Sequence, residues 1–190
     1  MIKQVLVPIA DGSEEIEAVT IIDVLRRAGA CVTVAGVGTL QITASRGVKI
    51  VADKMIAECA GETYDLIALP GGMPGAENLR ESRELIRLLE DQRAQDRWYA
   101  AICAAPAVVL APHGWLAGRH ATCHPDFSGQ LGNAIFSTDR VVVDGRCITS
   151  QGPGSALEFA LTLVAVLFGE KEAADVASPM VMQPVCRDKS

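Results

Sequence analysis

One cysteine of this sequence stands where a protein chain can present a nucleophile. Cys103 follows an apolar run at residues 98–102 and precedes Ala104, Ala105 and Pro106, which suit the first turn of a helix. Such a strand-to-helix turn has the pattern of a nucleophile elbow, in which small neighbours let the chain bend sharply. The helix N-terminus offers N–H groups and a partial positive charge, and thiols there can have a pKa lowered from about 8.5 to roughly 3.5–7.5. We therefore predict that Cys103 is a reactive thiol; a buried structural cysteine is the alternative.

A carboxylate near the N-terminus is the second candidate for chemistry. The sequence predicts a helix from Ser13, its capping residue, to about Ala28, and on it Glu17 shares one stripe with Ile21 and Val24. A carboxylate on an apolar stripe is costly unless it is paired or protonated. Its raised pKa would let it hydrogen-bond a neighbouring thiolate and shuttle a proton. An acid that merely stabilises the helix dipole is the alternative, and this suits Glu14 better.

Backbone donors and one histidine complete the candidate site. Gly71 and Gly72 follow a buried strand, and their N–H groups, together with that of Ala104, are candidates for an oxyanion hole that binds substrate. A plain tight turn is the alternative for the two glycines. His124 follows a short predicted strand and is a candidate for the same cleft, with a structural histidine as the alternative. No cluster of His, Cys and Asp has metal-ligand spacing, so we predict no metal site.

The elements that must position these residues alternate between strand and helix. The patterns predict strands at 5–10, 32–37, 66–69 and 98–102, and β-hairpins at 41–52 and 141–148. They predict helices at 13–28, 82–95, 154–169 and 173–181. This order predicts an α/β fold with a doubly wound parallel sheet. In such sheets the functional cleft lies beyond the carboxyl ends of the strands, where residues 11–17, 71–75 and 103–106 converge.

Composition limits the classes of function. The chain has 190 residues, of which 49% are apolar, and a net charge of −6. The negative charge and the lack of a basic cluster argue against specific nucleic-acid binding. No apolar segment is long enough to span a membrane, and the N-terminus lacks the pattern of a secretion signal. We therefore expect a cytoplasmic protein with one domain over residues 1–190, in which most of the six cysteines are small buried side chains.

The same residues carry a resemblance to a known family. The matching segments lie in order across nearly the whole chain: Gly12-Ser13-Glu14-Glu15-Ile16-Glu17, Ser45-Arg46-Gly47, residues 64–72, Ala100-Ala101-Ile102-Cys103-Ala104-Ala105-Pro106, and Thr149-Ser150-Gln151-Gly152-Pro153-Gly154. The sequence resembles the ThiJ/PfpI superfamily, specifically its Parkinsonism-associated deglycase branch. The resemblance implies a flavodoxin-like homodimer, similar to class I glutamine amidotransferases, with no cofactor. It also implies that Cys103 is the reactive thiol, Glu17 its protonated partner, Gly72 and Ala104 backbone donors, and His124 the nearby histidine.

The resemblance also implies what the site acts on. Members of this branch are described as glyoxalases and as deglycases that act on methylglyoxal or glyoxal adducts of proteins and nucleic acids. They are also described as oxidative-stress sensors and redox-regulated chaperones, and some carry an older label from thiazole-phosphate biosynthesis. PfpI-type proteases place His directly after the nucleophile, where this chain has Ala104, and amidotransferases have His-x-Glu where His124 is followed by Pro125 and Asp126. We therefore predict a glyoxalase or deglycase for a small aldehyde or a glycated protein, with a redox sensor as the alternative and a cysteine peptidase or a thiazole-phosphate protein less favoured.

Overall fold

The centre of the molecule is one mixed β-sheet. The computed structural model describes residues 2–182. Seven strands hydrogen-bond in the order β10-β11-β7-β6-β1-β2-β5, and every neighbouring pair is parallel except β10 and β11. In chain order these strands are β1 (Gln4–Ala10), β2 (Cys31–Val37), β5 (Lys54–Met55), β6 (Leu66–Leu69), β7 (Trp98–Ile102), β10 (Val141–Asp144) and β11 (Cys147–Ser150). The α/β fold with a parallel-dominated, doubly wound sheet is therefore confirmed.

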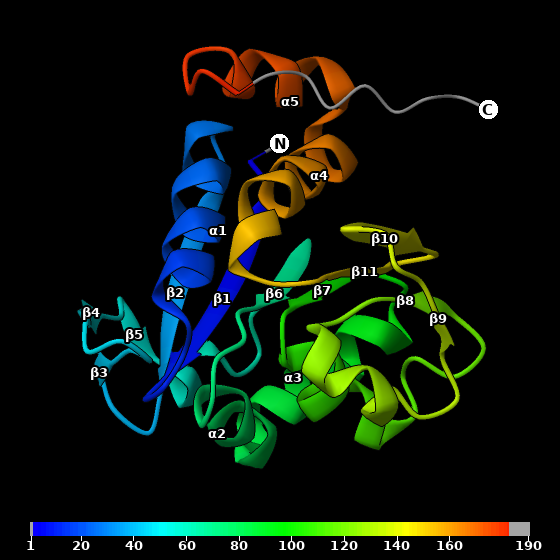
Figure 1. The fold of residues 1–190 in the computed structure, drawn as a ribbon. Coiled ribbons are helices and arrows are strands. Elements are labelled where there is room, and N and C mark those ends of the chain that lie inside the picture. Colours follow the sequence, from blue (N-terminus) through cyan, green and yellow to red (C-terminus); the bar gives the residue numbers. More distant parts are fainter. Residues whose placement is uncertain (1, 183–190) are drawn as a thin grey trace.

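Helices cover both faces of this sheet. The helices are α1 (Glu15–Arg27), α2 (Gly75–Glu81), α3 (Arg83–Ala94), α4 (Ala156–Phe168) and α5 (Glu170–Ala177). Helix α1 packs against α4, and α4 packs against α5, whereas α3 packs on β6 and β7 from the other side of the sheet (Figure 1). Two small two-stranded pieces lie outside the main sheet: the hairpin of β3 (Gln41–Thr43) and β4 (Lys49–Val51), and the pair of β8 (His120–Ala121) and β9 (Ile135–Phe136).

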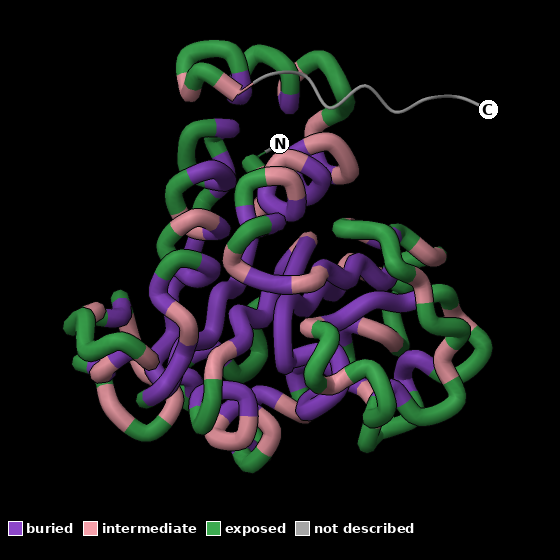
Figure 2. The backbone as a smooth tube through the Cα atoms, in the orientation of Figure 1, coloured by how far each residue is buried: buried purple, intermediate pink, exposed green. Residues whose placement is uncertain are grey.

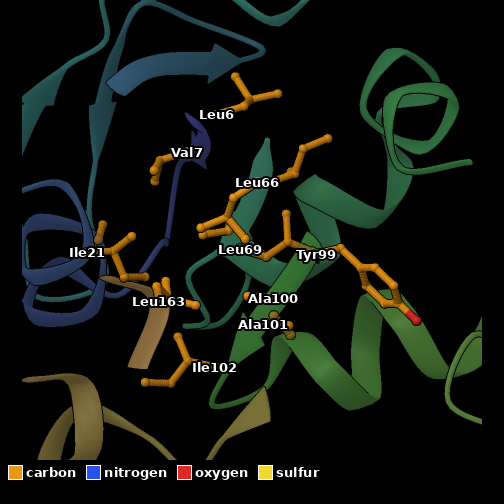
Figure 3. Packing of buried hydrophobic residues seen from close by; sticks show 14 of the residues in the cluster. Leu6, Val7, Ile21, Leu66, Leu69, Tyr99, Ala100, Ala101, Ile102 and Leu163 are labelled. Atoms are coloured by element: carbon orange, nitrogen blue, oxygen red, sulfur yellow. The ribbon is translucent and has the colours of Figure 1, made fainter. Parts of the chain in front are cut away.

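The central strands are buried on both faces, as their unbroken apolar sequences predict. All residues of β6 are buried, as are all residues of β1 after Gln4 (Figure 2). Ile21 of α1 and Leu163 of α4 belong to the same apolar cluster as Val7 of β1, and Figure 3 shows these side chains gathered on one side of the sheet. This packing fixes the strand ends, from which the candidate site residues emerge.

Several local predictions differ from the structure. Ser13 does not cap α1: its Oγ accepts the N–H of Ala10, and the Glu14 side chain caps the helix instead. The chain after Cys103 forms a wide π-type turn at Pro106–Leu110 rather than an ordinary α-helix. Helix α2 was not expected from the sequence. The last helix begins at Glu170, earlier than the predicted residue 173, because Gly169 ends α4 with a φ of +99° and acidic residues follow it.

The structure also bears on two further predictions, the burial of the cysteines and the lack of a membrane-spanning segment. Of the five cysteines within the described residues, four are buried and Cys31 is exposed. Cys186, the sixth cysteine, lies outside the described residues. No helix between residues 2 and 182 has the length and apolar character needed to cross a bilayer.

Candidate active site

Cys103 sits on a strained turn at the carboxyl end of β7. Its φ is +64°, a left-handed conformation that costs a non-glycine residue about 1–3 kcal/mol and that surrounding contacts must hold. Its N–H donates to the carbonyl of Ser150 at 3.0 Å, and its own carbonyl accepts the N–H of His124 at 2.9 Å. A Cβ on Gly71 would lie 2.6 Å from the Cβ of Cys103, so residue 71 must be glycine for this turn to fit. The predicted elbow geometry is therefore present.

Glu17 lies in the first turn of α1 and is completely buried. The Glu14 carboxyl accepts the N–H of Glu17 at 2.8 Å, which fixes the start of the helix. One carboxylate oxygen of Glu17, Oε2, accepts the N–H of Gly71 at 2.7 Å. The other oxygen, Oε1, has no partner in strict hydrogen-bond geometry among residues 2–182, although Cys103 is close enough to shift the pKa of this carboxyl. The apolar stripe predicted this burial correctly.

The environment favours the protonated form of Glu17. Burial raises the pKa of the carboxyl from 4.5 to about 7, and the negative charge of Glu14 adds to this effect. The N–H of Gly71 opposes it by stabilising the carboxylate. A carboxyl with a pKa near 7 both gives and accepts a proton at neutral pH, which is the property of a general acid or base.

The thiol does not have the lowered pKa that the sequence predicted. Burial and then the charge of Glu17 raise the pKa of Cys103 from 9.0 to about 12, although the N–H groups of Gly72 and Ala104 lower it. The expectation of a lowered thiol pKa is therefore wrong, and burial is the main reason. Near pH 7 the thiol therefore keeps its proton and the Glu17 carboxyl is partly ionised. Transfer of the thiol proton to the ionised carboxyl would convert the sulfur to a thiolate.

The backbone donors divide between the two partners of this pair. The N–H of Gly71 is bound to Glu17, whereas the N–H groups of Gly72 and Ala104 act on the sulfur of Cys103. Gly72 has a φ of +85°, and a Cβ there would lie 2.5 Å from the backbone nitrogen of Glu14. Two of the three predicted donors thus lie at the thiol. Whether they also bind a substrate oxygen stays a prediction.

His124 is attached to the elbow through its backbone. Its N–H bonds to the carbonyl of Cys103, but its imidazole contacts other residues: Nδ1 accepts the N–H of Asp126 at 3.3 Å, and the ring meets Phe127 edge-on. A Cβ on Gly152 would lie 3.5 Å from the imidazole Cδ2. The side chain is about one-third exposed. A catalytic role for His124 therefore stays a prediction.

Sequence reasoning missed residues that hold the site rather than react in it. Ser150 supplies the carbonyl that fixes the Cys103 N–H, and its hydroxyl lies 2.7 Å from that of buried Ser155. Ser150 belongs to the 149–154 segment noted in the sequence, which was the available signal. Glu14 was assigned only to the helix dipole, and glutamate is not a preferred capping residue, so propensity gave no signal. Across residues 2–182, no group of three His, Cys, Asp or Glu side chains is placed to hold a metal ion.

The fold and the site together define a class of protein: a doubly wound α/β protein with a cysteine on a strained elbow beside a buried carboxyl. The DJ-1/PfpI family matches residues 3–166 of the chain. This chain belongs to the DJ-1/PfpI family. The family and the fold expected from the sequence are thereby confirmed.

Individual relatives agree with this assignment. Protein DJ-1 homolog B of Arabidopsis thaliana is 51% identical over 170 residues, which cover 89% of this chain and 39% of that protein. The chain likewise spans 47% of DJ-1 homolog A of the same plant, so it matches less than half the length of each of these two relatives. A glutathione-independent glyoxalase, DJR-1.2 of Caenorhabditis elegans, is 38% identical and is covered over 95% of its length, against 94% of this chain. The structure of oxidized Toxoplasma gondii DJ-1 has a TM-score of 0.92 and 50% identity, with 95% of this chain and 98% of that chain covered.

Proposed function

We propose that this protein is a cysteine-dependent glyoxalase and deglycase that needs no cofactor. Its substrates would be methylglyoxal or glyoxal and their adducts with proteins or nucleotides. The observation that carries the proposal is the contact of the Cys103 thiol with a fully buried carboxyl, Glu17, whose pKa is raised to about 7. The glyoxalase name of the C. elegans relative supports it.

The first step of the proposed reaction forms a carbon–sulfur bond. With the thiol proton on Glu17, the thiolate of Cys103 attacks the aldehyde carbon of methylglyoxal. The electron pair of the carbonyl bond moves to oxygen, and this oxygen takes the proton from Glu17 to give a hemithioacetal. The N–H groups of Gly72 and Ala104 stabilise the negative charge of the thiolate before the carbon–sulfur bond forms.

The second step moves a hydrogen from the sulfur-bearing carbon to the neighbouring carbonyl carbon. The carboxylate of Glu17 removes the hydrogen on the sulfur-bearing carbon as a proton, which leaves an enediolate with its charge on the neighbouring oxygen. Return of this proton from Glu17 to the neighbouring carbon, with transfer of the hydroxyl proton from the first oxygen to the second, gives the thioester of a 2-hydroxy acid. Water then cleaves the carbon–sulfur bond and restores the Cys103 thiol. One dicarbonyl and one water yield one 2-hydroxy acid, with no net change in the protein.

Turnover without glutathione tests this proposal. Purified protein should convert methylglyoxal to lactate, and Cys103→Ser should abolish the reaction. Cys31→Ser is the matched control, because Cys31 is exposed at the start of β2 and outside the site. Lactate formation by Cys103→Ser at the wild-type rate would show that the thiol is not the nucleophile.

A redox function is the second candidate, and one observation favours it. The N–H groups of Gly72 and Ala104 act on the sulfur and suit an oxidised sulfinate as well as a thiolate, and a protonated Glu17 would add a third donor. We propose that two equivalents of peroxide oxidise the Cys103 thiol to a sulfinic acid, with release of two waters, and that this oxidation changes the binding of partner or client proteins. Peptide mass spectrometry after limited peroxide treatment tests it. Oxidation at Cys31 with Cys103 unmodified would rule it out.

Assembly and location are also proposals. We propose a homodimer, and exposed apolar side chains support it: Ile16 and Val19 on α1, and Val48 and Val51 on the neighbouring hairpin. Sedimentation of the purified protein tests this, and a single species of monomer mass would contradict it. We further propose one domain over residues 1–190 and a cytoplasmic location, which limited proteolysis and cell fractionation test.

A further inference from the structure

Helix α2 begins in unusually close contact with the turn that leads to Glu17. Gly75, its first residue, is buried. A Cβ on Gly75 would lie 2.6 Å from the carbonyl carbon of Gly12 and 2.6 Å from the Cα of Ser13, whereas ordinary Cβ contacts are 3.4–4 Å. Both neighbours are backbone atoms, so no flexible side chain can move aside. The two segments approach this closely only because residue 75 has no side chain.

Hydrogen bonds hold the same turn from two sides. Asn78, one turn further along α2, donates from Nδ2 to the carbonyl oxygen of Asp11 at 2.8 Å. On the other side, the N–H of Ser45 in the β3–β4 hairpin donates to the carbonyl of Ser13 at 2.9 Å. The turn at residues 11–13 is therefore held in place by hydrogen bonds from α2 on one side and from the hairpin on the other.

The position of this turn determines where the Glu17 carboxyl lies. Glu14 follows the turn directly, and its N–H donates to the carbonyl of Gly71 at 3.0 Å. Its side chain then caps α1 at Glu17. Glu17 in turn bonds to the N–H of Gly71, which lies against Cys103. The approach of residues 11–14 to residues 71–75 thus sets the separation of carboxyl and thiol.

We propose that Gly75 is a positioning residue for the Cys103–Glu17 pair, because its missing side chain fixes how closely the carboxyl approaches the thiol. Adding one methyl group must displace a backbone segment by about 1 Å, and a misplacement of this size can lower the rate about 10²-fold. Gly75 touches no reacting atom and acts only through Glu17. The turnover part of the test rests on the proposed function; the labelling part does not.

Gly75→Ala and Gly129→Ala form a matched pair of variants. Gly129 is exposed, and a Cβ there would meet no atom within 4 Å. The pH profile of Cys103 alkylation by iodoacetamide reports the coupling of thiol and carboxyl without any turnover. We expect Gly75→Ala to shift the midpoint of this profile and to lower kcat/KM for methylglyoxal about 10²-fold. Gly129→Ala should match wild type in both measurements.

Repeating the Gly75→Ala measurement in the Glu17→Gln variant separates an effect on the position of the Glu17 carboxyl from a general loss of stability. In Glu17→Gln, the Gly75→Ala change should no longer shift the alkylation midpoint, because no titrating carboxyl remains to be moved. An unshifted midpoint in the wild-type background, or the same shift in both backgrounds, overturns the proposal.

A milder variant covers the case in which Gly75→Ala does not fold. Asn78→Ala removes the hydrogen bond to Asp11 without adding an atom, and should shift the midpoint in the same direction by less. A wild-type midpoint in Asn78→Ala would also overturn the proposal. If the wild-type protein does not turn over methylglyoxal, the proposed function fails, while the alkylation profiles still decide the role of Gly75.

Discussion

Glu17→Gln should change how the stability of this protein depends on pH. The wild-type carboxyl is completely buried, and burial raises its pKa to about 7 from the ordinary value of 4.5. The amide of glutamine has nearly the same shape, its oxygen can still accept the N–H of Gly71, and it does not titrate. The substitution therefore removes one ionisation while preserving the packing.

The sign and the size of this pH dependence follow from the linkage between protonation and folding. Between pH 4.5 and about 7 the unfolded chain has lost the Glu17 proton while the folded chain keeps it, so the free energy of unfolding falls as pH rises. This contribution is fully present below pH 4.5 and is lost once pH passes about 7. A pKa difference of this size, at 1.36 kcal/mol per unit, corresponds to about 3 kcal/mol. The raised pKa of Cys103 affects the free energy of unfolding only above pH 9.0.

Urea unfolding across this range measures the effect. The free energy of unfolding of wild type, relative to that of Glu17→Gln, should fall by about 3 kcal/mol from below pH 4.5 to above pH 7. Glu90→Gln, at an exposed position on α3, is the control for removing one negative charge, and it should keep the wild-type pH dependence. Parallel curves for wild type and Glu17→Gln would refute the reasoning, because the buried carboxyl would then not have a raised pKa.

Three further predictions concern the same residues. Glu17→Gln should lower turnover of methylglyoxal about 10²–10⁴-fold, the range for a lost general acid or base, and an unchanged kcat would limit Glu17 to a structural role. Gly71→Ala should cost about 1–3 kcal/mol in urea unfolding, because its Cβ would overlap Cys103; a stability equal to that of Gly129→Ala would contradict this. Glu15→Gln should weaken the loss of stability in acid below pH 4.5, since burial raises the pKa of Glu15 but hydrogen bonds from Ser45 and backbone donors together outweigh it and lower that pKa; a thermal stability that falls in acid as steeply as in wild type would argue against it.

The main strands could be predicted from the sequence almost to the residue. Strands β6 and β7 have the predicted bounds because apolar residues continue up to Pro70 and Cys103, which end the pattern abruptly. Helix α2 gave no comparable signal, since Gly75–Glu81 buries only three residues and is too short to show a helical period. The π-type turn at Pro106–Leu110 could not be predicted either, because a segment buried on all sides has no apolar periodicity that would distinguish it from an α-helix.

The sequence predicted that Glu17 and the backbone of Gly72 and Ala104 lie close to Cys103, as the structure has them, but it did not predict their electrostatics, and their roles in a reaction stay predictions. Glu17 could be found because helical spacing placed a carboxyl on an apolar stripe. The raised pKa of Cys103 could not, since a sequence shows the N–H groups of a turn but not the depth of burial or the nearby charge. The capping error has a similar origin: Ser13 and Glu14 are adjacent acceptors, and only the fold shows that the Ser13 hydroxyl turns back to Ala10.

Two acidic residues in the same helical turn serve opposite purposes. Glu15 accepts from Ser45 Oγ at 2.7 Å and from the N–H of Arg46 at 2.8 Å; burial raises its pKa, but these hydrogen bonds outweigh burial and lower it. Glu17, two positions later, points in a different direction, and among residues 2–182 only its Oε2 has a donor in hydrogen-bond geometry. The stability from Glu15 is therefore lost as pH falls below 4.5, and that from Glu17 is lost as pH rises toward 7. As pH rises from 4.5 toward 7, the fold therefore keeps the stability contributed by Glu15 and loses that contributed by Glu17, the carboxyl that accepts the N–H of Gly71 beside Cys103.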